Sequence, residues 1–528
     1  MSLPFWEFVA AGVLGLVLGA AQRAVVVALY RKWFRQGFAG DAALHLAVVR
    51  ELKRGRYTGI PQFLIKDEPD SYPILFHRFA ALFPMRVVEI HPYLPNLVLW
   101  SLFTGIAGLY AQYVGSVLLQ LDGIGFAAVF IGLFLTLASN ISLDLNGLNY
   151  ISLSERLTAR VSCGLYFAAL AVWLRYHDPV SLAVVAGAGT AAGISSMFGR
   201  QAVAFVTPVV AVILLDPRPL VGLVLAVLGS LAVDRDYFLR GIRHMVEAAR
   251  VYNRHTKHSR YYRLGLSHFL DVRELLRRRV SPDWTLTQLE TREPTRLLFR
   301  YPELLLLAAV WFHHGAGLAD PAVAVVVATL VVYVATSTAA LRHFGEANRY
   351  IEYNLCVLAP MALAAAALSG WITQDALAIY ACWLLIVVLR RYQVWWRLSY
   401  PERDVLRQFI EPLRLGHEHT LFTVPFNLGS AVSARAPCRA IMYQGSEFTI
   451  VQYQKFFEEI PFLKRDWRTL AGEFGVTHII AEKSFISSAK TLMGWEYDFS
   501  ALRVLAETDR YIAYAVDART VTMGKSAA

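Results

Sequence analysis

Long apolar stretches separated by short polar segments dominate the first 390 residues of the chain. A helix needs about 17 to 25 mostly apolar residues to cross a bilayer. Stretches of about this length lie near residues 6–30, 94–116, 122–140, 159–174, 180–197, 200–215, 218–233, 297–315, 320–339, 350–369 and 372–390. They predict about eleven transmembrane helices. The first stretch lacks a basic start and is longer than a signal-peptide core, so it is predicted to remain as a membrane anchor.

The pattern changes after Arg390. Short apolar runs at 420–426, 478–481 and 511–516 alternate there with helical patterns, and polar residues become frequent again. Such alternation is typical of a small α/β domain. The sequence therefore predicts a polytopic α-helical membrane domain over residues 1–390, followed by a soluble α/β domain over residues 391–528.

Composition and charge support this division. Apolar residues make up 56% of the chain and charged residues 17%, whereas about a quarter of the residues of a soluble domain are charged. The four cysteines are too few for a disulfide framework. Residues 31–95 carry a net charge of +4 and residues 234–300 a net charge of +7, out of +11 for the chain. Basic loops between spans suit anionic lipids or lipid phosphates, and no nucleic-acid-binding signature is present, so nucleic acid is not expected as a partner.

The segment 234–300 mixes basic, aromatic and apolar residues. This mixture predicts amphipathic helices that lie on a membrane face. Together with 31–95, this segment is predicted to form one of the two large loops of the membrane domain.

The first loop contains a carboxylate and an imidazole at helical spacing. Asp41 and His45 are four residues apart, and on a helix this spacing places both side chains on one face. The alternative is a solvated turn in which Asp41 caps the start of a helix, and spacing alone favours that alternative.

An acidic run follows in the same loop. Asp67, Glu68 and Asp70 directly precede Tyr72, and three carboxylates so close together repel one another unless a cation or a basic partner compensates. The run could bind a divalent cation such as Mg²⁺ or Mn²⁺, contribute a general base, or form a solvated acidic turn. The sequence leaves the cofactor open.

A third polar cluster opens the span near 350–369. Arg342, Glu346, Arg349 and Tyr353 follow at i, i+4, i+7 and i+11, which places them on one helix face. Two arginines and a tyrosine make a suitable binding site for a phosphate. The structural alternative is an ion pair of Glu346 with one of the arginines.

Two further polar sets lie at span ends, one around Glu155 and Arg156 and one around Arg200. Counting spans places both on the same side of the membrane as Asp41 and Arg349. Polar side chains that converge on one face of a membrane domain indicate a functional site.

Three motifs resemble elements of one family, the GT-C superfamily of polytopic glycosyltransferases, which use polyprenyl-phosphate-linked sugars. They are Gly40-Asp41-Ala42-Ala43-Leu44-His45, Tyr72-Pro73-Ile74-Leu75-Phe76-His77 and Gly345-Glu346-Ala347-Asn348-Arg349-Tyr350. Ile74 stands where the family's first-loop element has a second proline. The WWDYG element of oligosaccharyltransferases is absent, since Trp395-Trp396 continues as Arg397-Leu398.

The resemblance implies an inverting single displacement in which Asp41 acts as general base. It also implies a polyprenyl-phosphate sugar donor, an acceptor that is a glycan, a lipid or a protein, and a multi-pass protein of the plasma (inner) membrane. The active site and the C-terminal domain would then face away from the cytoplasm. The residues implied for catalysis are Asp41, His45 and Glu68, and those for the lipid phosphate are Arg200, Arg342, Glu346, Arg349 and Tyr353. Further candidates are Asp67, Asp70, Tyr72, His77, Glu155 and Arg156.

The alternative function is a flippase for lipid-linked glycans or another secondary transporter, which would also have many spans. Transporters of this kind are expected to show broken helices and internal repeats near the midplane. No repeat is detectable here. A membrane scaffold that uses the C-terminal domain for interaction is a further alternative, and it would need no catalytic carboxylate.

Overall fold

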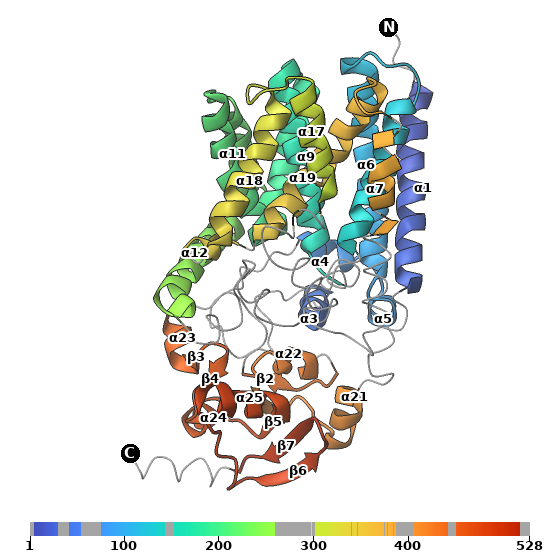
Figure 1. Ribbon diagram of the computed structural model, residues 1–528. Coiled ribbons are helices and arrows are strands. Elements are labelled where there is room, and N and C mark those ends of the chain that lie inside the picture. Colours follow the sequence, from blue (N-terminus) through green and yellow to red (C-terminus); the bar gives the residue numbers. More distant parts are fainter. Residues whose placement is uncertain are drawn as a thin grey trace, which may run out of the picture.

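A bundle of long helices and a smaller domain built on a β-sheet make up the structure, and the sheet domain lies at one end of the bundle (Figure 1). The computed structural model describes residues 5–29, 42–53, 75–142, 153–258, 297, 301–338, 340–345, 347–373, 375–376, 378–383, 385–386, 405–433, 435–441 and 450–517. The predicted fold class, a polytopic helical membrane protein with a small C-terminal α/β domain, is confirmed.

The helices of the bundle coincide with the predicted apolar stretches. In chain order they are α1 (Phe5–Leu29), α6 (Leu94–Tyr113) with the π-helical turn Val114–Leu118, α7 (Gly125–Ser142), α9 (Arg156–Tyr176), α10 (Pro179–Ser195), α11 (Met197–Leu214), α12 (Pro219–Arg254), α17 (Pro302–His313), α18 (Pro321–Ser337) and α19 (Ala347–Leu368). Within the described residues, five helices are long and apolar enough to cross a membrane, namely α1, α6 with its π turn, α9, α11 and α19. The count of about eleven spans stays a prediction.

Local sequence signals fix where several helices begin. Asp178 precedes Pro179 and accepts a hydrogen bond from the backbone N–H of Ser181 at 2.6 Å. Ser196 caps the next helix by accepting from the N–H of Gly199 at 2.9 Å. These caps satisfy backbone donors that have no partner inside the helix.

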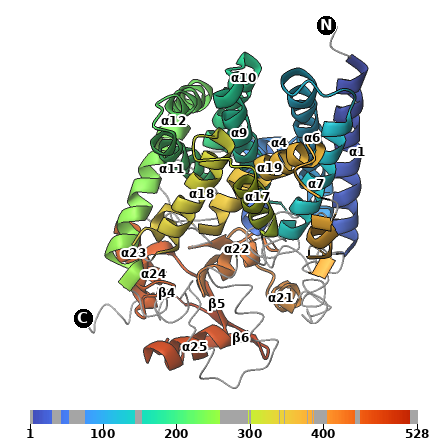
Figure 2. The same cartoon turned by 45° about the horizontal axis from the view of Figure 1, so that its top comes forward.

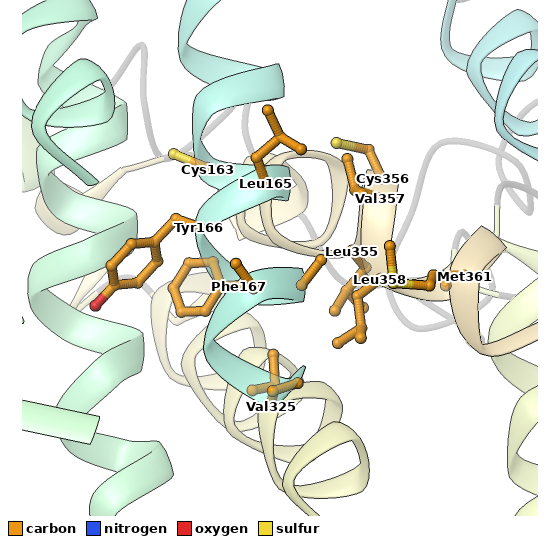
Figure 3. Packing of buried hydrophobic residues seen from close by; sticks show 14 of the residues in the cluster. Cys163, Leu165, Tyr166, Phe167, Val325, Leu355, Cys356, Val357, Leu358 and Met361 are labelled. Carbon is orange, nitrogen blue, oxygen red and sulfur yellow. The ribbon is translucent and has the colours of Figure 1, made fainter. Parts of the chain in front are cut away.

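Helix α9 forms the centre of the bundle. Nearly all of its side chains are buried, and it packs against α19 at a close approach where a Cβ on Gly164 would come within 2.4 Å of Cys356 Sγ. Figure 3 shows the packed side chains around this crossing, with Val325 contributed by α18. The glycine therefore allows the two helices that carry most of the candidate site to lie against each other.

Helix α12 breaks where it leaves the bundle. Asp234 has non-helical backbone angles (φ −159°, ψ 87°), and its carboxylate accepts from the N–H of Tyr237 at 3.0 Å, so it caps the helix that restarts. The segment beyond the break continues to Arg254 toward the sheet domain (Figures 1 and 2). The segment Asp234–Arg254 is called the α12 arm below.

Three short helices lie between the bundle and the sheet domain (Figure 1). They are α3 (Ala42–Lys53), α4 (Leu75–Ala80) and α5 (Met85–Ile90), and all belong to the predicted first loop. They share a small apolar core with Leu153, which precedes α9.

The sheet domain has five strands in the order β2-β1-β5-β7-β6. Its strands are β1 (Thr420–Val424), β2 (Arg439–Ala440), β5 (His478–Glu482), β6 (Arg503–Glu507) and β7 (Tyr511–Ala515), and a separate hairpin is formed by β3 (Phe457–Glu459) and β4 (Phe462–Leu463). Its helices are α21 (Val405–Ile410), α22 (Leu428–Ser433), α23 (Ile450–Phe456), α24 (Trp467–Phe474) and α25 (Lys483–Met493). Strands β1, β2 and β5 are parallel to one another, and β7 runs antiparallel to both of its neighbours, β5 and β6. Neighbouring residues of β5 enter two different apolar cores, one on each face of the sheet.

Within the described residues, α22 and α23 of the sheet domain contact the rest of the chain. Helix α22 contacts α3. The α12 arm contacts α23, where the Glu247 carboxylate accepts from the N–H of Ile450 at 3.1 Å. Farther along, Val251 is buried in the core of the sheet domain, and the His255 ring stacks on Tyr453 with 4.4 Å between centroids.

Candidate functional site

Three side chains that were singled out separately from the sequence form one buried chain. The Nδ1 atom of His45 lies 2.9 Å from Nε2 of His77, and Nε2 of His45 lies 3.1 Å from the Glu155 carboxylate. His45 and His77 are almost completely buried, and Glu155 is 9% exposed. The three residues come from α3, α4 and the start of α9, so they join the first loop to the central helix.

Both ring nitrogens of His45 are engaged, and this fixes its orientation. When the neutral His45 ring carries its proton on Nε2, close to the Glu155 carboxylate, its Nδ1 accepts from Nε2–H of His77. When His45 is protonated, its Nδ1–H donates to Nε2 of His77, and its positive charge pairs with Glu155. A carboxylate that orients an imidazole in this way is a recurring support for proton transfer. The three side chains can therefore hold a proton and pass it between His45 and His77.

An apolar cluster explains why His45 lies beside His77. Ala42, Leu46 and Val49 recur at i, i+4 and i+7 along one face of α3 and pack against Phe76 of α4 and Leu153. His45 lies on the neighbouring face of α3, where it contacts His77 of α4 and Glu155 at the N-terminus of α9.

A second set of polar residues lies at the N-terminal end of α19. The guanidinium of Arg349 stacks on the ring of Phe198 from α11, with 3.7 Å between Cζ and the ring centroid. Glu352 is 4% exposed and accepts hydrogen bonds from Asn348 Nδ2 at 2.9 Å and from the Tyr301 hydroxyl at 3.1 Å. The second set is thus rigidly held in the bundle.

Tyr353 connects the two sets. Its side chain is 1% exposed, and its hydroxyl interacts electrostatically with Arg349, Arg156 and Glu155. Among the described residues, this hydroxyl has no hydrogen-bond partner. A buried phenol that interacts with two arginines can donate to an anion that enters the site.

Arg200 faces a different part of the bundle. Its Nε–H donates to the backbone carbonyl of Gly193 at 2.6 Å, and its Cζ lies 4.8 Å from the centroid of the Tyr237 ring. It is 6% exposed, and within the described part of the chain its Nη2 has no hydrogen-bond partner. Arg200 therefore points toward α10 and α12, whereas Phe198 of the same helix lies under Arg349.

Most of the remaining candidates lie outside the described residues. Asp41, Asp67, Glu68, Asp70, Tyr72 and Glu346 lie outside the described residues, and of Arg342 only the backbone, in the turn Arg342–Phe344, is described. Among the side chains that are described, no group of three or more His, Cys, Asp and Glu is arranged to hold a metal ion. A divalent cation at the acidic run stays a prediction.

Three residues at this site, Glu352, Tyr301 and Phe198, were not predicted from the sequence. Glu352 and Tyr301 form their own hydrogen bond, and Phe198 supports Arg349. The signal that could have identified Glu352 is a carboxylate inside an apolar span, because intramembrane charges are costly and are usually retained for function. Phe198 carries no such signal in the sequence.

We expect replacement of Glu155 to weaken the fold. Glu155→Ala leaves His45 Nε2 buried without its carboxylate, which should cost about 1–3 kcal/mol of unfolding free energy. Glu155→Gln keeps the shape and a hydrogen-bonding group, so it should cost less. Both effects can be measured by denaturant unfolding in detergent.

The matched control is Glu89→Ala, which removes the partner of Arg50. That ion pair spans 2.9 Å, but the Glu89 side chain is 41% exposed, so its loss should cost about 1 kcal/mol or less. An equally small effect of Glu155→Ala would mean that the buried contact with His45 does not form.

Comparison with known proteins identifies similar chain layouts but no close relative. No known family model matches the sequence, and no curated protein matches it. Among solved structures, ArnT from Cupriavidus metallidurans bound to undecaprenyl phosphate aligns over 96% of this chain and 98% of its own, with a TM-score of 0.47 and 14% identity. The same protein in the apo state aligns over the same shares with a TM-score of 0.40 and 15% identity. Since both TM-scores lie below 0.5, the function proposed below rests on the residues of this chain.

Proposed function

We propose that this protein is an inverting glycosyltransferase that moves a sugar from a polyprenyl-phosphate donor to an acceptor on the side of the membrane where the sheet domain lies. The observation that carries the proposal is the buried chain His77–His45–Glu155, which meets Arg349 and Arg156 at Tyr353. Side chains that fix the start of α3, directly after the predicted base Asp41, thus interact through Tyr353 with arginines that can bind a phosphate. This is the pairing that such a transfer requires.

The proposed reaction is a single displacement at the anomeric carbon of the sugar. Asp41, predicted as the base, takes the proton of the acceptor hydroxyl, and the acceptor oxygen bonds to the anomeric carbon. The bond between that carbon and the phosphate oxygen of the donor breaks, and the lipid phosphate leaves with the electron pair. Because attack and departure occur on opposite faces, the configuration inverts.

The described histidines support the base in this proposal. His45 is the fourth residue of α3 and follows Asp41 by four positions. Glu155 and His77 hold its ring from both sides, so the start of α3 is fixed relative to α9. Here His45, His77 and Glu155 act as positioning residues, and Glu68 stays a predicted alternative for the base or for a cation ligand.

The leaving phosphate gains negative charge as the bond breaks, and the site supplies cations and a hydroxyl for it. Arg349 stacks on Phe198, and the Tyr353 hydroxyl interacts electrostatically with both Arg349 and Glu155. We assign Arg349 and Tyr353 to the phosphate. Arg200, Arg342 and Glu346 stay predicted contributors.

The proposal is tested by following both products. Purified protein in lipid nanodiscs is incubated with a panel of polyprenyl-phosphate sugars and candidate acceptors. Sugar transfer and release of lipid phosphate in equal amounts are expected. A transporter or scaffold would release no lipid phosphate from any donor, and that result across the panel would contradict the proposal.

The orientation in the membrane is a separate prediction. The basic loops 31–95 and 234–300 would face the cytoplasm by the positive-inside rule, but the rule weakens for loops as long as about 60 residues. We expect reporter fusions after Ile60 and at the C-terminus both to report export. If both report the cytosolic side, the extracytoplasmic placement of the site is wrong.

A further inference from the structure

We infer that the α12 arm (Asp234–Arg254) lies against the headgroup region of anionic lipids and holds the sheet domain to the membrane surface. This inference does not depend on the proposed glycosyl transfer. It follows from which side chains of the arm are exposed, from their chemistry and from what the arm contacts in the sheet domain.

The exposed face of the arm is amphipathic. Leu239, Ile242 and Val246 are 46%, 40% and 46% exposed, and their spacing of three and four residues places them in one strip along the helix. Arg243 and Arg250 are also exposed and lie beside this strip. A strip of aliphatic side chains flanked by arginines is the pattern of a helix that lies in a membrane interface.

Helix α12 also exposes aliphatic side chains before its break. Val224 and Leu228, before the break at Asp234, are 53% and 56% exposed, as expected for residues in contact with lipid. Leu239 and Val246 are each 46% exposed after the break. Exposed aliphatic side chains therefore occur on both parts of α12.

The charges on this face fit one partner. Arg235, Arg243, Arg250 and Arg254 are exposed, and Asp236 is the one exposed carboxylate of the arm. The half-buried Glu247 accepts from Arg250 at 3.1 Å. The exposed surface is thus net basic. Arginines beside buried aliphatic side chains favour anionic headgroups over neutral ones.

The arm also contacts the sheet domain. Glu247 and Val251, together with His255 directly after the arm, make the contacts with Ile450, with the domain core and with Tyr453 described above. One helix therefore touches both lipid and the sheet domain. This arrangement fixes the height of the sheet domain above the bilayer.

Site-directed spin labelling of the full chain tests the inference. A nitroxide is placed at Val246 in a Cys382→Ser background, because Cys163, Cys356 and Cys438 are buried and Cys382 is exposed. Collisions with oxygen, which concentrates in lipid, and with a water-soluble nickel chelate are compared in nanodiscs of phosphatidylcholine with and without phosphatidylglycerol. Labels at Val224 and at Val504 of β6 serve as the lipid and the aqueous reference.

In discs with phosphatidylglycerol, the label at Val246 is expected to favour oxygen as the label at Val224 does, and to shift toward the aqueous value when phosphatidylglycerol is omitted. The triple variant R243Q/R250Q/R254Q should show the same shift in anionic discs. Accessibility like that of Val504 in both lipids would overturn the inference. Equal protection in both lipids, unchanged by the triple variant, would overturn the part that assigns anionic lipid.

Discussion

Replacing Asp41 with Asn is expected to lower the rate of sugar transfer by about 10²- to 10⁴-fold, the usual contribution of a general base. The amide keeps the size of the carboxylate but cannot take the proton of the acceptor hydroxyl. Binding of the donor should change little, because the residues proposed to bind its phosphate lie on α19. The rate is measured as released lipid phosphate per unit of folded protein in nanodiscs.

Asp122→Asn provides the matched control. Asp122 is exposed in the turn between the π turn after α6 and α7, at the opposite end of the bundle from His45, so this variant should transfer sugar at the wild-type rate. If Asp41→Asn retains full turnover, Asp41 is not the base. Glu68 would then become the first carboxylate to replace.

Replacing Arg349 with Ala should lower kcat/KM for the polyprenyl-phosphate donor by about 10- to 150-fold. This range corresponds to about 1.5–3 kcal/mol for the loss of hydrogen bonds to a charged group. Arg349→Lys keeps the charge but loses the flat stacking on Phe198, and an ammonium cannot bind a phosphate through two parallel N–H groups. Its effect should lie between those of wild type and Ala.

The control for this pair is Arg175→Ala. Arg175 is 57% exposed and pairs with Asp320 at 2.9 Å, on the end of α9 away from Glu155. Its removal should leave kcat/KM unchanged, since surface ion pairs contribute little. If Arg349→Ala behaves like Arg175→Ala and remains folded, Arg349 does not contact the donor phosphate.

The transmembrane helices could be predicted because their length and apolarity follow from the thickness of the bilayer. Helices α1, α6, α10, α11 and α18 begin and end within a few residues of the predicted stretches. The α12 arm was harder to delimit. Its sequence becomes charged after residue 233, where the helix breaks at Asp234 and then restarts, so the end of the apolar stretch marked the break and not the end of the helical segment.

The sequence identified individual residues of the candidate site but not the contacts between them. His45, His77 and Glu155 were all candidates, yet nothing in the sequence links them, since Glu155 is 110 residues away from His45. Their contact depends on the apolar cluster that packs α3 and α4 beside the start of α9. The orientation of Arg200 could not be predicted from the sequence either. It depends on how α10 and α12 pack around α11.

The contact between α22 and α3 places the sheet domain directly against the helix that carries His45. A substitution on α22 can therefore affect α3 without altering any membrane-spanning segment. Under the proposed function, we expect acceptor preference to respond to changes on α22 while donor binding on α19 stays constant.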